Sequence, residues 1–175
     1  RLVPGFGRKG ITNFIKTASL TIQMSANPYH QIEYCSFDSC NAETFYPIIS
    51  LPTVSSDTVA INNCKFQNSV GNGRALGLID SRQPLLLRRC VFDSNNGFGA
   101  LVRSNTLELD SCRFSTTNSS LFSTYSGTPN QPLHLLLAEF CAFPRFGTFI
   151  TVLGGSGFDS VVATNCYWGD PSGPT

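Results

Sequence analysis

Charged residues are scarce in this sequence. Among 175 residues there are 12 lysines and arginines and 11 aspartates and glutamates, so 13% of the chain is charged and the formal net charge is +1. That fraction is about half of what globular proteins usually carry. The nearest approach to a basic run is the pair Arg88 and Arg89, which is too short to follow a phosphate backbone, so we expect no nucleic-acid partner.

Long apolar runs and metal-binding clusters are also lacking. The longest apolar segments are as short as FITVL at 149–153, whereas a membrane-spanning helix needs about 18 residues, so we expect no membrane span. The two histidines, His30 and His134, belong to no recognisable catalytic constellation. Cys35 and Cys40 are the only closely spaced cysteines and have no matching second pair, so we expect neither a metal nor a cofactor.

The length suits one domain, and we interpret residues 1–175 as a single domain. The chain begins at Arg1, without an initiator methionine or a secretory signal segment. We therefore expect a processed product or a part of a longer polypeptide.

What the sequence does contain is an internal repeat. Six segments align without gaps on a cysteine: HQIEYCSF, VAINNCKF, LLLRRCVF, LELDSCRF, LLAEFCAF and VVATNCYW. The aligned cysteines are Cys35, Cys64, Cys90, Cys112, Cys141 and Cys166, separated by 29, 26, 22, 29 and 25 residues. An aromatic residue follows two positions after each one: Phe37, Phe66, Phe92, Phe114, Phe143 and Trp168.

The spacing within each repeat predicts two short strands joined at a bend. The positions three and five before the cysteine are apolar except at His30, and with the cysteine and the aromatic they alternate on one face of an extended chain. Gly-, Asn- and Ser-rich turns follow, and no helical periodicity is sustained. A propeller blade would need about 40 residues, while one turn of a β-solenoid stacks identical side chains every ~4.8 Å.

The sequence thus predicts an all-β fold, a parallel β-helix (β-solenoid) of about six coils. Its expected hand is right-handed, from the general preference of parallel crossovers. Residues 1–29 would form an irregular first coil and residues 30–175 the six repeats.

The segment CVFDSNNGFGAL at 90–101, with weaker copies CKFQNSVGNGRALGL and CSFDSCNAETF, resembles the repeats of polymorphic outer-membrane proteins and related bacterial and protist surface proteins. Those repeats pair an FxxN motif, here Phe92 to Asn95, with a Gly-Gly-Ala-Ile-like motif. The closing NCYWGDPSGP resembles a segment common at the end of β-helix domains in large secreted and cell-surface proteins. The resemblance covers residues 30–175 and implies the pectate-lyase-like β-helix superfamily, which includes adhesins, polysaccharide lyases, glycosidases and phage tailspikes.

We interpret the cysteine and aromatic positions as core ladders. Cysteine is among the most buried residue types, and stacked rings contribute on the order of 1 kcal/mol per pair beyond the area they bury. We expect mostly free, buried thiols. Cys40 stands outside the aligned column, so we expect it to be the cysteine that is exposed or paired.

The candidate site is the outward-facing stripe two positions before each cysteine. This stripe reads Glu33, Asn62, Arg88, Asp110, Glu139 and Thr164, and Glu108 lies one outward position away from Asp110. Asp110 and Glu139 could form the carboxylate pair of a glycosidase, with Arg88 and Arg89 holding an acidic sugar. The competing interpretation is a solvated stripe in which Arg88 pairs with Asp110 for under about 1 kcal/mol.

The leading functional hypothesis is a non-catalytic, extracellular or cell-surface protein with a structural or adhesive role. Its expected partners are surface glycans or further copies joined through the coil ends, with a head-to-tail filament as one form. The alternative is a polysaccharide lyase or glycoside hydrolase acting on an outer face through Asp110, Glu139, Glu108 and Arg88. Asn118 begins an acceptor triplet for glycosylation, which matters if the protein is secreted in a eukaryote.

Overall fold

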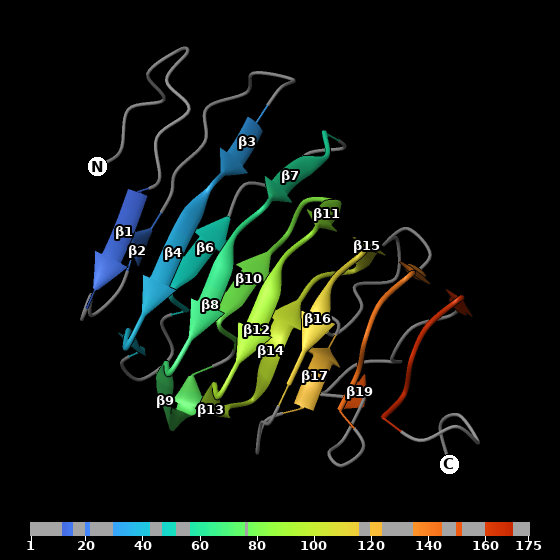
Figure 1. The fold of residues 1–175 in the computed structure, drawn as a ribbon. Coiled ribbons are helices and arrows are strands. Elements are labelled where there is room, and N and C mark those ends of the chain that lie inside the picture. Colours follow the sequence, from blue (N-terminus) through green and yellow to red (C-terminus); the bar gives the residue numbers. More distant parts are fainter. Residues whose placement is uncertain are drawn as a thin grey trace, which may run out of the picture.

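The protein is a β-solenoid built of parallel strands (Figure 1). The computed structural model describes residues 12–15, 20–21, 30–42, 47–51, 57–75, 77–115, 120–123, 135–144, 150–151 and 160–169, and within these ranges it contains strands and no helix. Figure 1 shows the strands stacked side by side from the N-terminal to the C-terminal coil. The predicted all-β parallel solenoid is confirmed.

Four sheets run along the stack, here called A, B, C and D. Sheet A orders β1 (Thr12–Ile15), β4 (Cys35–Asp38), β8 (Lys65–Gln67), β12 (Val91–Asp93) and β16 (Arg113–Phe114). Sheet B orders β2 (Leu20–Thr21), β6 (Ile49–Leu51), β10 (Ile79–Ser81), β14 (Ala100–Arg103), β17 (Ser120–Ser123) and β19 (Ile150–Thr151). Sheet C orders β3 (His30–Glu33), β7 (Val59–Asn62), β11 (Leu85–Arg88), β15 (Thr106–Asp110), β18 (Leu135–Glu139) and β20 (Ser160–Thr164). Sheet D holds β5 (Asn41–Ala42), β9 (Val70–Ala75) and β13 (Asn96–Phe98).

The chain visits these sheets in the order A, D, B, C. Sheets B and C each stack six strands, but sheet D has only three, so in the described residues three coils have a strand in every sheet. The prediction of about six coils was therefore too high for complete coils. In the other units, the residues between sheets A and B lie largely outside the described ranges.

The gapless alignment of the repeats matches the strand register. Leu85 pairs with Val59 on one side and with Leu107 on the other, as the alignment predicts. In sheet A the aromatic column is in register as well, with Phe66 opposite both Phe37 and Phe92. Identical side chains favour stacking in register, so the repeated residues specify the pairing.

Sheets C and A meet at a one-residue bend directly before each aligned cysteine. The bend residue has φ between 51° and 54° at Tyr34, Asn63, Arg89, Phe140 and Asn165, and 55° at Ser111. One residue in the left-handed region reverses the inward and outward alternation, which lets both the residue three before the cysteine and the cysteine itself face the interior. A second such bend, at Ser39, Asn68 and Ser94, joins sheets A and D.

The interior is filled by the two predicted ladders. Ring centroids lie 4.8 Å apart for Phe37 and Phe66, 4.8 Å for Phe66 and Phe92, and 4.7 Å for Phe92 and Phe114, with nearly parallel planes. The stack continues from Phe114 to Phe143 and then to Trp168. The ring centroids of Phe143 and Trp168 lie 4.6 Å apart.

All seven cysteines are free thiols, as expected of a packed column. The thiols of Cys90 and Cys112 donate hydrogen bonds to the carbonyls of Ile61 and Leu87, each in the preceding coil and each 3.3 Å away. The thiols of Cys64 and Cys166 bond in the same way to Ile32 and Ala138. These four thiols therefore tie their coils to the preceding ones.

The expectation for Cys40 was wrong, because this residue is fully buried and forms no disulfide. Cys40, Ser69 and Asn95 occupy the same position, five after the aligned cysteine, and all three are buried just after the second bend. They form a second interior column that the sequence did not reveal, because its members differ from coil to coil. Asn95 joins two coils, donating to the Phe66 carbonyl at 3.0 Å and accepting from the Ser69 amide at 3.1 Å.

No helix among the described residues is long and apolar enough to cross a membrane.

Candidate functional site

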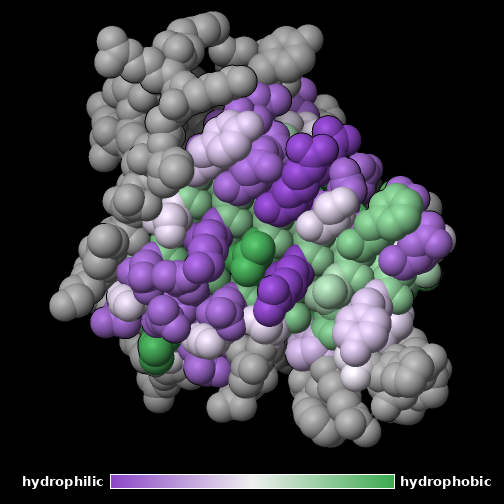
Figure 2. Space-filling model, in the orientation of Figure 1, coloured by the Kyte–Doolittle hydropathy of each residue, from purple (hydrophilic) through white to green (hydrophobic). Residues whose placement is uncertain are grey.

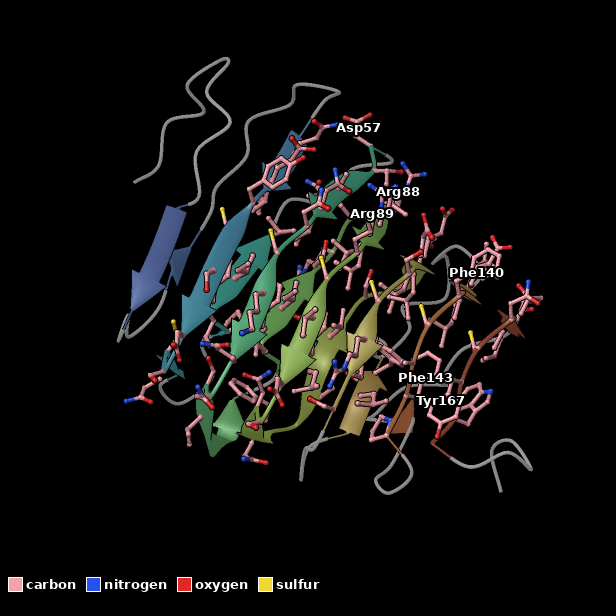
Figure 3. The ribbon with its side chains drawn as sticks, viewed as in Figure 1. Asp57, Arg88, Arg89, Phe140, Phe143 and Tyr167 are labelled. Atoms are coloured by element: carbon pink, nitrogen blue, oxygen red, sulfur yellow. The ribbon has the colours of Figure 1, made fainter. Side chains whose placement is uncertain are left out.

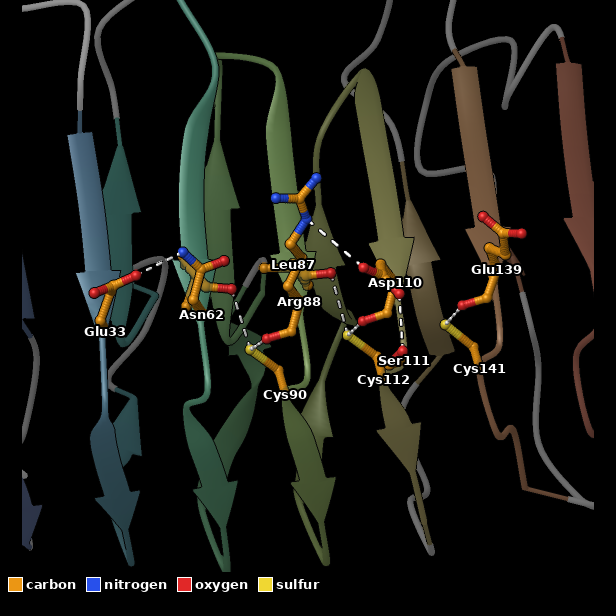
Figure 4. Close-up of polar contacts among 11 residues, drawn as sticks. Glu33, Asn62, Leu87, Arg88, Cys90, Asp110, Ser111, Cys112, Glu139 and Cys141 are labelled. Carbon is orange, nitrogen blue, oxygen red and sulfur yellow. Dashed lines mark hydrogen bonds and ion pairs between the residues drawn. The ribbon is translucent and has the colours of Figure 1, made fainter.

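The candidate site lies on the outer face of sheet C. Side chains alternate along each strand, so when Leu87 faces the core, Leu86 and Arg88 face outward. The register places Arg88 beside Asp110 and Asp110 beside Glu139 on successive strands. Figure 4 shows these side chains in one row, continuing Glu33 and Asn62 from β3 and β7.

A shallow groove of about 310 Å³ runs over β11, β15, β18 and β20. Its polar lining is Arg88, Glu108, Asp110, Glu139 and Thr164, and its outward apolar lining is Leu86, Leu137 and Val162. All four residues proposed from the sequence for a catalytic site therefore line one groove. The apolar floor was not anticipated, although the alternation along β11, β18 and β20 contains it.

Polar contacts run along this outer row. Arg88 Nε lies 3.7 Å from Asp110 Oδ2, and the two side chains are 56% and 44% exposed. At the N-terminal end of the row, Asn62 Nδ2 donates to Glu33 Oε1 at 3.0 Å. The pairing of Arg88 with Asp110 expected for a solvated stripe is thus present, and at this exposure such a pair contributes under about 1 kcal/mol.

The groove carries an excess of negative charge. Glu108, Asp110 and Glu139 face a single cation, Arg88, while Arg89 occupies the bend and is not part of the lining. Negatively charged side chains repel an anionic ligand that approaches the surface. The groove therefore favours neutral or cationic ligands over polymers of acidic sugars.

The Asp110 carboxylate is positioned from two sides. Arg88 approaches Oδ2, and the Ser111 hydroxyl donates to Oδ1 at 2.8 Å. Glu139 and Glu108 have no ion-pair partner among the described residues. Of the acidic side chains in the groove, Asp110 is thus held in place by its neighbours, and the other two are free to meet a ligand.

The cysteine ladder does not offer an accessible nucleophile. Hydrogen bonding with the thiols of Cys141 and Cys90, followed by burial, raises the pKa of Cys112, and burial raises the pKa of Cys166. Hydrogen bonds from the thiols of Cys112 and Cys64 lower the pKa of Cys90 to about 4, but Cys90 is fully buried. A reactive cysteine needs access as well as a low pKa, and Cys90 has no such access.

The other sequence candidates are a metal site, Asn118 and the two histidines. In the described part of the chain, no three His, Cys, Asp or Glu side chains are placed to hold a metal ion. Asn118 and His134 lie outside the described residues, and so does the side chain of His30.

The chain matches no family model, no curated protein and no solved structure in the three comparisons made.

Proposed function

We propose that this chain is a non-catalytic structural or adhesive β-solenoid. The observation that carries the proposal is the arrangement of its polar side chains: the thiols are interior ladder residues, and Arg88, Asp110, Asn62 and Glu33 are engaged in pairs along the outer stripe. A catalytic constellation converges on one reacting atom, whereas these contacts repeat along the stack. A regular and weakly charged stack of coils suits adhesion or assembly.

The proposed location is the cell surface or the extracellular space. Support comes from the FxxN and Gly-Ala pattern of residues 90–101 and from the NCYWGDPSGP segment, which resemble surface-protein repeats. The uncharged polar composition agrees with a surface that meets glycans, and the ends of the coils supply edges at which copies can associate.

The test is an activity screen paired with a binding screen. We expect no turnover of neutral or uronate-containing oligosaccharides, and no difference between wild type and Asp110→Asn in that screen. Binding to a glycan array, or self-association observed by electron microscopy, is the expected positive result. Turnover that disappears in Asp110→Asn would contradict the proposal.

A second candidate function, glycoside hydrolysis, is favoured by one specific observation. Asp110 and Glu139 are direct partners on adjacent strands and both line the groove. Neighbouring strands lie about 4.8 Å apart, and retaining glycosidases hold their two carboxyl groups about 5 Å apart. In such an enzyme Asp110, oriented by Arg88 and Ser111, would be the nucleophile and Glu139 the acid and base.

The hydrolase hypothesis predicts a particular stereochemistry of cleavage and a particular set of inactive variants. Neutral oligosaccharides would be cleaved with retention at the anomeric carbon, because the pair is too close to admit a water between the carboxyl groups. Asp110→Asn and Glu139→Gln would each abolish cleavage, whereas Glu33→Gln, on the same stripe but outside the groove, would leave it unchanged. Equal rates in all variants would remove Asp110 and Glu139 from the mechanism.

A further inference from the structure

The two ends of sheet C differ in how well their interior is covered. At the N-terminal end, Ile32 of β3 is 9% exposed. At the C-terminal end, all five residues of β20 are exposed, including Val161 at 44%. Val161 and Ala163 occupy inward positions that are buried in β7, β11 and β15, and no described residue forms a coil beyond β20 that would cover them.

The peptide groups of β20 show which of them face the open edge. The amide of Phe140 donates to the Thr164 carbonyl at 3.2 Å, so the Thr164 carbonyl points back toward β18. Peptide groups alternate in direction along a strand. Those of Val161 and Ala163 therefore point away from β18, and among the described residues β20 pairs with no other strand.

This edge carries none of the features that usually block pairing. The sequence SVVAT contains no charge and no proline, and three of its residues are β-branched. Proteins ordinarily protect an exposed edge strand with lysine, proline or a bulge. Further apolar side chains flank it: Val162 is 45% exposed, Phe140 58% and Tyr167 60%. Figure 3 shows Phe140 and Tyr167 on this side of the molecule, and Figure 2 shows apolar surface gathered toward the same side.

We propose that β20 pairs antiparallel with β20 of a second copy of this chain, about a two-fold axis at Val162. In this register Val161 lies opposite the partner's Ala163, and Ala163 lies opposite the partner's Val161. Both are the residues whose peptide groups face the edge, so each pair exchanges two hydrogen bonds. Their side chains all face inward and continue the core from one protomer into its partner.

The outward side of this register is equally self-complementary. Val162 faces the partner's Val162, and Ser160 faces the partner's Thr164, so the contact brings together no like charges. Such an interface is isologous: the same strand serves both protomers and the assembly closes at two copies. The two six-stranded C sheets become one, and the two grooves, each bordered by Val162, become continuous.

A head-to-tail arrangement fits these observations less well. It would place β3 of the next copy on β20, with its Gln31 beside Val162. That contact needs an open N-terminal end, but Ile32 of β3 is already covered. Our inference rests on the proposed self-association through coil ends, and it specifies the partner, the strand and the register.

Disulfide trapping tests the register directly. Facing residues of a non-hydrogen-bonded antiparallel pair have Cα atoms about 4.5 Å apart, within disulfide range. We expect Val162→Cys to form a covalent dimer under mild oxidation, with a mass twice the chain's 19.0 kDa, while wild type does not. The matched control is Gln31→Cys, an exposed residue at the equivalent outward position on β3, which we expect to stay a single chain.

Sedimentation and cross-linking of mixed variants provide two further tests of the two-fold dimer. Wild type is expected to sediment as a dimer and Val162→Lys as a monomer with an unchanged circular dichroism spectrum, because the substitution places two like charges face to face. Cross-linking only in mixtures of Val162→Cys with Gln31→Cys would show head-to-tail stacking and overturn the two-fold model. A wild type that remains monomeric at high concentration would also overturn it. Either result would leave the adhesive function to be decided separately, by the activity screen and the glycan array.

Discussion

At the bend before each of the six aligned cysteines, one residue adopts the left-handed backbone conformation, which is unusual for residues other than glycine. Asparagine, found at Asn63 and Asn165, adopts the left-handed region readily because its short polar side chain can bond locally. Tyr34, Arg89 and Phe140 take the same φ without that advantage. For most L-residues the left-handed region costs roughly 1–2 kcal/mol. The chain thus tolerates strain at exposed bends because the ladders on both sides fix the geometry.

Phe140→Asn should stabilise the protein by about 0.5–1 kcal/mol. Phe140 has a φ of 52° and is 58% exposed, so the substitution relieves backbone strain and loses little buried surface. Urea unfolding of Phe140→Asn and wild type measures the difference. The control is Phe143→Asn, which removes a 3% exposed ring from the stack and should destabilise by about 3 kcal/mol or more. A destabilised Phe140→Asn would mean that the ring makes contacts worth more than the strain.

At the scale of the strand, uncharged partners stabilise the carboxylates that follow the aromatic ladder. The Asp38 carboxylate of β4 accepts hydrogen bonds from Gln67 at 2.6 Å, Asn68 at 3.1 Å and Ser39 at 3.0 Å. The Asp93 carboxylate of β12 accepts from Ser115 at 2.5 Å and Ser94 at 3.1 Å. These bonds favour the ionised form, so they lower the pKa of Asp38 and of Asp93 below the ordinary 3.8.

The lowered pKa values predict an acid-sensitive component of the free energy of unfolding. Folded-state pKa values below the unfolded value stabilise the fold above about pH 4, and that stabilisation is lost as pH falls through the lowered pKa values. The double variant Asp38→Asn with Asp93→Asn should therefore show a flatter stability profile between about pH 4 and 2. Chemical unfolding across this range is the measurement. Asp57→Asn, outside both ladders, is the control, and a loss of slope in that variant would place the effect elsewhere.

The strands that could be predicted from sequence are those whose coils repeat the same residue. In sheets A and C the cysteine, the aromatic and the preceding apolar positions recur, and identical side chains stack in only one register. Sheet D was missed because Cys40, Ser69 and Asn95 fill one column with three residue types. The gathering of Arg88, Asp110 and Glu139 on one face was predictable from alternation. The apolar groove floor could not be predicted, because the shape of the groove depends on how side chains of neighbouring coils pack. The distances between residues along the sequence do not determine that packing.

At the scale of the whole molecule, most of the interactions between coils run in one direction, along the stack. Each strand bonds to its counterparts in the coils before and after it, and the thiol and ring ladders follow the same axis. In such an array stability is approximately a sum of coil terms and neighbour terms, so an end coil lacks one of its two neighbours. The covered Ile32 and the open Val161 show that the two ends are not equivalent.

Amide hydrogen exchange should reveal this gradient. The Val59 amide donates to the Pro84 carbonyl of the following coil at 2.9 Å, whereas the Val161 amide occupies the same position with no following coil among the described residues. We expect Val59 to exchange roughly a thousandfold more slowly than Val161 in the monomeric Val162→Lys variant, because Val59 needs the central coils to open. In dimeric wild type the Val161 and Ala163 amides should gain protection, while Ser160 and Val162, whose peptide groups face β18, change little. Equal protection of Val161 and Val59 in the monomeric variant would show that another part of the chain closes the C-terminal edge, and the same measurement would locate the bonds that do so.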